Sequence, residues 1–255
     1  MNKRLLVMTI LGIFTVSGLI AGLFEGSIER ALIVPMAAKV AAMTRTNPAR
    51  PTPTPTMTTN VLAQDTFQRQ DQTLWGTASD MRQWEGDANN PNDSAIFSIA
   101  NATGQIAHGQ GTFNAVIGQA STDEEAMLTG QMNQFTNGAN IGVVLRWQDV
   151  NNWYKAYING THLRIIKNVQ GTSSTVSSVP FQAQDGTLYA LRFRVVGAML
   201  FAKAWQNGTP EPANWMITAN DTSLNSGQVG IRVLTNQDNV VTITSFKATA
   251  ANGTM

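Results

Sequence analysis

The sequence predicts an all-β fold, a two-sheet antiparallel sandwich, that follows an N-terminal transmembrane or signal helix. Short runs rich in β-branched and aromatic residues recur from Val61 onward, and clusters of Gly, Asn, Asp and Pro separate them. No long helical pattern interrupts this series. Many short strands at near-regular spacing are typical of sandwiches and barrels. Cysteine is absent, which excludes a disulfide scaffold and thiol catalysis.

The first segment, residues 1–24, is a candidate membrane segment. The run from Leu5 to Phe24 has no charged residue and follows the basic pair Lys3 and Arg4. A helix needs about 20 apolar residues to cross a bilayer, and basic residues before it favour a cytoplasmic N-terminus. The alternative is a cleaved signal peptide, whose apolar region is usually shorter, ~7–15 residues. We expect a single-pass cell-membrane protein with an extracytoplasmic C-terminal domain, or else a secreted protein.

The second segment, residues 25–60, joins this helix to the predicted sandwich at 61–255. It begins with a juxtamembrane stretch and ends in NPARPTPTPTMTTN at 47–60. Pro-rich stretches of this kind adopt extended polyproline II structure and act as semi-rigid spacers. The linker would therefore hold the sandwich away from the membrane.

Charge is distributed unevenly between these parts. Residues 1–60 hold six of the 17 Lys and Arg residues and two of the 16 Asp and Glu residues, so residues 61–255 carry a formal charge of −3. A mildly acidic domain is not a general nucleic-acid binder, because binding to phosphates needs a basic surface.

The strands of the sandwich are predicted where apolar and polar residues alternate between turn signals. Alternate side chains of a strand point to opposite faces, so each such run has a core side and an outer side. The predicted strands are Ala95–Ala100, Gly111–Ile117, Ala126–Phe135, Ile141–Trp147, Trp153–Asn159, His162–Val169, Leu188–Val195, Met199–Trp205, Gln228–Leu234 and Val240–Thr249.

The stretch from Ile141 to Lys167 shows this alternation most clearly, with turns at 149–152 and 159–160. Asn-Gly at the second turn is a typical hairpin signal. One face of the three runs is apolar, and the other mixes cations with aromatic rings. The alternation places Trp147 on the apolar face, after Ile141, Val143 and Leu145, and Arg146 on the mixed face.

Six blocks of the sequence form a recognisable pattern: DTFQR at 65–69, LWGT at 74–77 with Trp84, LYALRFR at 188–194, AKAW at 202–205, GTPEPANW at 208–215 and GQVGIR at 227–232. These blocks resemble the concanavalin A-like lectin and glucanase (laminin-G-like) domains of bacterial surface proteins, and the resemblance extends over about residues 65–249. It implies a jelly-roll β-sandwich and a glycan or polysaccharide as partner, although the superfamily includes binders, hydrolases and adhesion modules.

A ligand-binding face is the main functional hypothesis. Aromatic rings stack on sugar faces, and Arg and Lys donate hydrogen bonds to hydroxyls and carboxylates. The alternative is a solvated face whose cations pair with Asp149, Asp185 or Glu211. If the later strands lie beside the central ones in one sheet, the face collects Arg146, Trp153, Lys155, Tyr157, Arg164, Arg192, Arg194, Lys203 and Trp205.

Catalytic signals are missing from the sequence. Glycoside hydrolysis needs two carboxyl groups across the scissile bond, and the E-x-D-x-E-like motif of jelly-roll glucanases is absent. We therefore expect a carbohydrate-binding (lectin-like) module without catalytic activity. Two alternatives stay open, a glycoside hydrolase using Glu211 with Asp149 or Asp185, and a structural or adhesion module of the cell surface.

The resemblance also implies a possible structural Ca²⁺ ion. Asp65, near the first strand, and Asp221, in a late loop, are the candidate metal-binding residues. The two histidines, His108 and His162, lack metal-ligand spacing.

Overall fold

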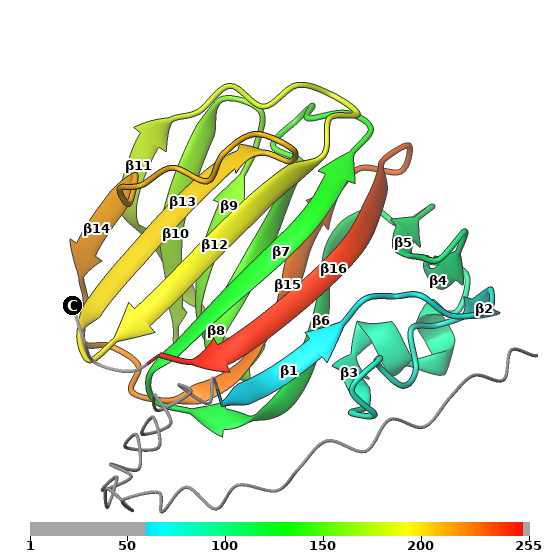
Figure 1. Ribbon diagram of the computed structural model, residues 1–255, viewed down its shortest axis with the longest axis horizontal. Helices are drawn as coiled ribbons and strands as arrows, with labels where there is room; N and C mark the ends of the chain where they lie inside the picture. Colours follow the sequence, from blue (N-terminus) through cyan, green and yellow to red (C-terminus); the bar gives the residue numbers. More distant parts are fainter. Residues whose placement is uncertain (1–59, 252–255) are drawn as a thin grey trace, which may run out of the picture. The chain divides into compact units, whose positions relative to one another are not determined.

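The computed structural model of the chain describes residues 60–251, which form a β-sandwich (Figure 1). The predicted membrane or signal helix and nearly all of the linker lie outside the described residues. Within residues 60–251, no helix is long and apolar enough to cross a membrane. The predicted all-β, two-sheet antiparallel class is confirmed for this part of the chain.

The larger sheet has nine strands in the order β14-β13-β12-β7-β16-β5-β4-β2, with β1 also paired to β16. Its strands come from both ends of the described chain, and every pairing within it is antiparallel. They are β1 (Val61–Asp65), β2 (Gln72–Thr73), β4 (Phe97–Ala100), β5 (Thr103–Ala107), β7 (Glu124–Met132), β12 (Tyr189–Val196), β13 (Met199–Gln206), β14 (Ile217–Asn220) and β16 (Val240–Ala250).

The smaller sheet has seven strands in the order β11-β10-β9-β8-β15-β6-β3. Two short 3₁₀ helices, η1 (Asp87–Asn89) and η2 (Pro91–Asp93), follow its edge strand β3. The strands are β3 (Trp84–Gly86), β6 (Gly111–Ser121), β8 (Asn140–Asp149), β9 (Asn152–Ile158), β10 (His162–Val169), β11 (Thr172–Pro180) and β15 (Gly227–Thr235).

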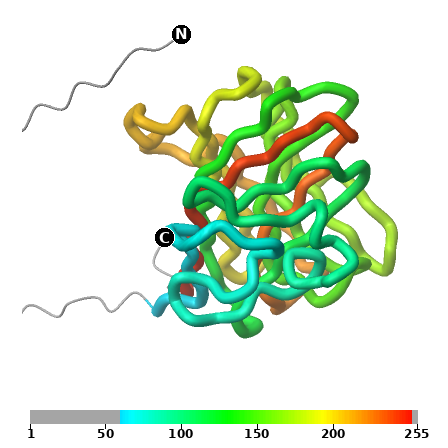
Figure 2. The backbone as a smooth tube through the Cα atoms, turned by 90° about the vertical axis from the view of Figure 1, so that its right-hand side faces the viewer, coloured from blue at the N-terminus to red at the C-terminus, as the bar shows by residue number. Residues whose placement is uncertain are grey.

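The core lies between the two sheets and is closed at one edge by an aromatic cluster. Trp75 and Trp84 are fully buried and pack edge-to-face with ring centroids 5.0 Å apart. Phe67 contacts both rings, and Phe246 of β16 contacts Trp84. The segment that carries β2 to β5 wraps this edge of the sandwich, as the cyan and teal tube in Figure 2 shows. Large aromatic rings here fill the space that the short strands leave open.

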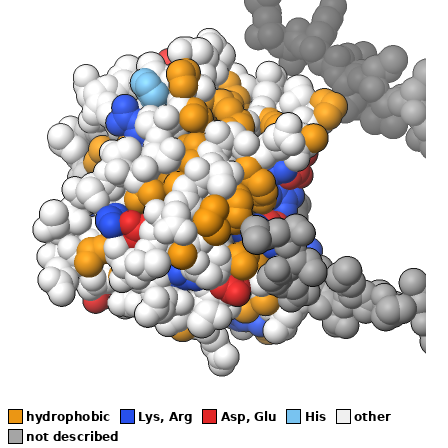
Figure 3. All heavy atoms as spheres, turned by 90° about the vertical axis from the view of Figure 1, so that its left-hand side faces the viewer, with side chains coloured by type: hydrophobic (Ala, Val, Ile, Leu, Met, Phe, Trp, Pro, Cys, Tyr) orange, Lys and Arg blue, Asp and Glu red, His pale blue; other side chains and the backbone are white. Residues whose placement is uncertain are grey.

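The opposite edge is formed by β11 and β14, the outermost strands of the two sheets. Apolar side chains of this edge, among them Val176, Val179 and Met216, are partly buried against the core. Hydrophobic atoms gather in the middle of this side of the molecule in Figure 3. Strand β11 bulges where its pairing with β10 shifts between Ile165 and Ile166.

A bulge in β8 overturns one part of the predicted alternation. Arg146 has a positive φ of 49°, and the register with β9 shifts between Leu145 and Asp149. An extra residue in a strand moves the following side chains to the other face. Trp147 therefore packs with Val144 on the outer side of the sheet, and the prediction that it faces the core is wrong.

The two halves of the predicted ligand face are not neighbours. Strands β8, β9 and β10 belong to the seven-stranded sheet, whereas β12 and β13 belong to the nine-stranded sheet. The side chains that point away from the core on these two sets of strands therefore lie on opposite sides of the sandwich. The expectation of one continuous surface is wrong, because alternation reports the face of a strand and not the sheet to which it belongs.

Candidate functional site

The outer surface of the seven-stranded sheet carries a polar row that crosses five strands. Arg164 pairs with Tyr157, Tyr157 with Gly142, Gly142 with Arg232, and Arg232 with Asn114. Neighbouring strands lie about 4.8 Å apart, so the backbone of this row spans roughly 19 Å. We call these residues, together with Lys155, the polar row, and the outer surface that carries them the seven-strand face.

Lys155 fills the middle of the polar row. A Cβ at Gly142 would lie 2.6 Å from the Cε atom of Lys155, so the lysine stem occupies the space that the glycine leaves free. The Lys155 ammonium donates to Asn140 Oδ1 at 2.5 Å and lies 4.9 Å from the centre of the Tyr157 ring. Only 3 % of the residue is exposed. Burial, and then the charge of Arg232, hold the pKa of Lys155 well below its usual value.

Arg232 is held by contacts with two aromatic rings and with a side-chain amide. Its guanidinium carbon lies 4.4 Å from the centre of the Trp153 ring and 5.9 Å from that of Trp147. It also donates to Oδ1 of Asn114. Burial lowers the pKa of Arg232 to about 10, and the charge of Asp87 acts in the opposite direction. Asp87 in turn accepts from the backbone N–H of Asn114 at 2.7 Å and from its side-chain Nδ2 at 3.3 Å, so the carboxylate holds the amide that binds Arg232.

The three rings of this face are already in contact with protein side chains. Trp153 is 2 % exposed, carries Arg232 on its ring, and donates from Nε1 to the Val150 carbonyl at 3.0 Å. Tyr157 carries the Lys155 ammonium. Trp147 lines an open cavity of about 450 Å³ together with Gln148 and Gln228. Trp147 is 8 % exposed, so a small part of its ring borders this open space.

The nine-strand face, the outer surface of the larger sheet, carries the other predicted residues. Arg192 binds Glu125 at 2.5 Å and Glu211 at 3.0 Å, and Lys203 binds Glu211 at 2.7 Å. Arg194 lies 3.9 Å from Glu125. Arg192 and Lys203 thus form the ion pairs with Glu211 that the alternative expects. These contacts lower the pKa of Glu211 although partial burial opposes them.

Two aromatic residues accompany this ion-pair network. Trp205 lies on β13, opposite Ala190 of β12, and is partly exposed. The loop that carries Glu211 also brings Trp215 over Lys203, with the ammonium 4.8 Å from its ring. The loop thus covers part of the nine-strand face.

Arg146 belongs to neither face. Its guanidinium donates to the carbonyls of Thr122, Gly197 and Leu224, at 2.7, 2.8 and 2.6 Å. These carbonyls come from three separate turns at one end of the sandwich. Arg146 is 3 % exposed, and the bulge at this position directs it there. Its geometry is that of a residue that joins loops.

The two candidate metal-binding carboxylates lie in different places and accept from donors. Asp65 is fully buried and accepts from Trp84 Nε1 at 2.7 Å and from Arg69 at 2.8 Å. Asp221 accepts from the Tyr154 hydroxyl and from Lys167, which help to lower its pKa. Within residues 60–251, no three His, Cys, Asp or Glu side chains are grouped as a metal site would require. Structural calcium stays a prediction of the resemblance.

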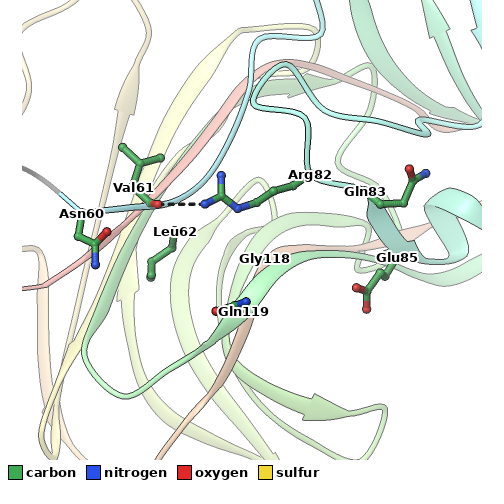
Figure 4. Close-up of a pocket in the computed structure, with 8 residues that line it drawn as sticks. All are labelled: Asn60, Val61, Leu62, Arg82, Gln83, Glu85, Gly118 and Gln119. Carbon is green, nitrogen blue, oxygen red and sulfur yellow. Dashed lines mark hydrogen bonds between the residues drawn. The ribbon is translucent and has the colours of Figure 1, made fainter.

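A separate cavity of about 430 Å³ lies beside Asn60 (Figure 4). Arg82 reaches across it to the Val61 carbonyl at 3.4 Å, and its guanidinium also binds Asp80 at 2.6 Å. The described residues that line it include no aromatic side chain. It offers fewer of the groups that recognise sugars than the seven-strand face does.

The three carboxylates of the hydrolase alternative each bind other groups of the protein. Glu211 is held by cations on the nine-strand face. Asp149 accepts from Asn151 and Asn152 in the β8–β9 turn, and Asp185 accepts from the backbone of Phe135. Nothing in these contacts favours hydrolysis by either pair.

The alternation of apolar and polar residues did not place Trp147, Arg232 and Asn114 on this surface. The signal for Arg232 is present, because Gln228, Gly230 and Arg232 alternate with the buried Val229, Ile231 and Val233. Trp147 could not be found this way, since its placement depends on the bulge. Asn114 lies in a run that is buried on both faces.

Comparisons with known proteins identify the fold. No protein-family model and no curated protein sequence matches the chain. The structure is similar to the carbohydrate binding module CBM66 from Bacillus subtilis, at 14 % identity and a TM-score of 0.51, covering 64 % of this chain and 94 % of that one. It is also similar to lectin I-B4 from Griffonia simplicifolia, at 13 % identity and a TM-score of 0.53, covering 74 % of this chain and 100 % of the lectin.

A third similar structure is an enzyme, xylan β-1,4-xylosidase from Bacillus halodurans C-125. It shares 13 % identity and a TM-score of 0.56 over 73 % of this chain, but the match spans only 38 % of the xylosidase. At these identities the likeness concerns the fold alone. The described part of the chain thus shares its β-sandwich fold with a carbohydrate binding module and a lectin, in agreement with the jelly-roll sandwich that the sequence blocks imply.

Proposed function

We propose that the chain is a carbohydrate-binding, lectin-like module and that its ligand binds on the seven-strand face. The observation that carries the proposal is the grouping on one face of three rings and three cations beside an open cavity lined by Trp147. Similar folds occur in a carbohydrate binding module and in a lectin, which supports the ligand class.

We expect the rings, amides and cations of this face to have different roles in binding. Trp147 would offer its apolar ring to a sugar, and Gln148 and Gln228 beside it would exchange hydrogen bonds with hydroxyls. Trp153 and Tyr157 hold cations in place, so their role would be to orient donors. Arg232 and Arg164 would then donate to the ligand along the polar row.

A glycan array probed with the full-length protein tests the proposal, followed by calorimetric titration of the strongest ligand. Trp147→Ala should weaken binding at least tenfold, about 1.4 kcal/mol, because it removes the ring beside the cavity. Gln148→Ala, an exposed position on the same cavity, should weaken it several-fold without disturbing the packed Trp147 cluster. Trp205→Ala on the nine-strand face is the matched control and should bind like the wild type.

Two results would reject this assignment. Loss of binding in Trp205→Ala, with normal binding in Trp147→Ala and Gln148→Ala, would place the ligand on the nine-strand face. An array on which the folded protein retains no glycan would remove the function itself.

Export and membrane tethering through residues 5–24 are part of the proposal. They are supported by the uncharged run and the basic pair before it. An exported binding module on a Pro/Thr-rich spacer would meet polysaccharides outside the cell. No contact in the described residues favours a catalytic function over this one.

A further inference from the structure

The two outer faces of the sandwich differ in how their cations are neutralised. On the nine-strand face, Arg192, Arg194 and Lys203 all lie within 4 Å of a glutamate. On the seven-strand face, none of the cations of the polar row forms an ion pair with a carboxylate of residues 60–251. The cations of the seven-strand face thus lack the carboxylate partners that those of the nine-strand face have.

Burial makes the absence of an anionic partner energetically unfavourable for these cations. Lys155 is buried, and the partner of its ammonium is the neutral amide of Asn140. Arg232 is half-buried against two tryptophan rings and bonds the neutral amide of Asn114. Removing cations from water without an anionic partner is unfavourable. The lowered pKa values of both groups have this desolvation as their largest cause.

The nearest carboxylate strengthens the same conclusion. Asp87 acts on Arg232 through its charge but lies beyond ion-pair distance, because it is bonded to Asn114 instead. The Asp87–Asn114 pair therefore orients the guanidinium and leaves it free of a direct anionic partner. An arginine held in this way keeps donors for a ligand, and its planar fork suits carboxylate and sulfate oxygens.

Arg164 marks the other end of the polar row. Its Nε atom is buried and has no hydrogen-bond partner among the described residues, and the side chain is partly exposed. It lies beside Tyr157 and opposite Ser178 of β11, which provides no charge. Two arginines of the row thus lie three strands apart, with Lys155 on a strand between them and Asn114 beyond Arg232.

We infer that the ligand of the seven-strand face is an acidic polysaccharide, whose carboxylate or sulfate groups lie along the polar row between Arg164 and Arg232. The inference rests on the proposed function and names the class of glycan. The two arginines contribute the direct hydrogen bonds, and Lys155 packs on the Tyr157 ring between them.

Pairs of polymers that differ only in charge test this inference with the full-length protein. Polygalacturonate is compared with its methyl ester, and dextran sulfate with dextran, by calorimetry in 50 mM and 500 mM NaCl. At least one anionic polymer should bind tenfold or more tightly than its neutral counterpart, and its affinity should fall with salt because released counterions dominate such binding. The two pairs separate carboxylate from sulfate recognition.

Variants then locate the anion. Arg232→Gln and Arg164→Gln should each reduce the preference for the charged polymer several-fold while leaving any binding of the neutral polymer. Arg164→Gln is the variant that keeps the test valid if Arg232→Gln unfolds, since Arg164 does not support the packed rings. Lys247→Gln, an exposed cation on the nine-strand face, is the matched control and should change nothing.

Three outcomes would overturn the inference. Equal binding of both members of every pair would leave a carbohydrate-binding face that is indifferent to charge. A preference that survives Arg164→Gln and Arg232→Gln but is lost in Lys247→Gln would place the anion on the other face. Absence of binding to all four polymers, together with a negative glycan array, would reject the acidic ligand and the proposed function together.

Discussion

Asp65 shows at the scale of one residue how a buried charge can serve the fold. Its carboxylate receives N–H groups from Phe67, Arg69 and Trp84 at 2.7–2.8 Å. A buried carboxylate is tolerated where donors surround it in this way. The aspartate thereby ties β1 to the aromatic cluster, which explains its position without requiring an ion.

Glu124 is the opposite case, a buried carboxylate with too few donors. Its Oε1 atom accepts from the backbone N–H of Arg146 at 2.5 Å, and Oε2 has no partner among the described residues. Burial raises the pKa of Glu124 well above 4.5, while the Arg146 charge opposes the shift and Asp123 adds to it. At pH values between the unfolded and the folded pKa of Glu124, the folded state therefore holds a proton that the unfolded state has lost.

Replacement of Glu124 by Gln should make the protein less sensitive to pH. Because the folded pKa is raised, the wild type is most stable below about pH 4.5 with respect to this group and loses stability as the pH rises through the folded pKa. The loss is up to about 1.4 kcal/mol per pH unit, and Glu124→Gln should not show it. Urea unfolding from pH 4 to pH 8 measures the difference. Glu85→Gln, at an exposed position, is the control, and a wild-type-minus-variant difference that stays flat over this range would contradict the prediction.

At the scale of elements, the bulge in β8 decides what the seven-strand face contains. One residue with a positive φ, Arg146, sends Trp147 outward and places a guanidinium among the loops. Alternation along the sequence predicted Lys155, Tyr157 and Arg164 correctly as outer residues, because their strands are regular there. It failed for Arg146 and Trp147, since a bulge leaves no mark in a short apolar run.

Gly142 tests the packing of the polar row. A Cβ at this position would meet the Ala156 carbonyl oxygen and Lys155 Cε, both at 2.6 Å. Gly142→Ala should therefore destabilise the protein by about 1–3 kcal/mol, measured by urea unfolding. In a double-mutant cycle, Lys155→Ala should recover part of that loss by removing the stem that the new methyl group displaces. Strict additivity of the two changes would show that Lys155 does not occupy this space.

At the scale of the whole molecule, the sequence predicted the class of fold but not the assignment of strands to sheets. Ten alternating runs were found, whereas β11 was missed because its Ser/Thr-rich residues are largely exposed. The short strands β2 and β14 carry too few residues for a pattern. The pairing of β12 with β7 joins segments far apart in the chain, and alternation has the same period in both sheets. The predicted single face is therefore divided between the two sheets.

The last strand, β16, should be indispensable to this arrangement. It pairs with β1, β5 and β7 in the interior of the nine-stranded sheet and buries Val241, Ile243 and Phe246. Each such side chain contributes about 1.5–3 kcal/mol, against a total stability of about 5–15 kcal/mol for a typical protein. A chain that ends at residue 239 should show no cooperative unfolding by near-ultraviolet circular dichroism. Lys247→Gln in the full chain should stay within about 0.5 kcal/mol of the wild type, and a truncated chain with a native spectrum would contradict this role.

The direction of the polar row has a consequence for how recognition could change. Because the row runs across the strands, its Arg164, Tyr157, Gly142, Arg232 and Asn114 positions sit on five different strands of one hydrogen-bonded sheet. A substitution at Arg164 can alter a donor without moving Arg232, which lies three strands away, as long as the new side chain remains compatible with the sheet. The sheet backbone therefore acts as a fixed support for side chains that can change separately. Preference for a different polymer could evolve one strand at a time while the sandwich itself stays the same.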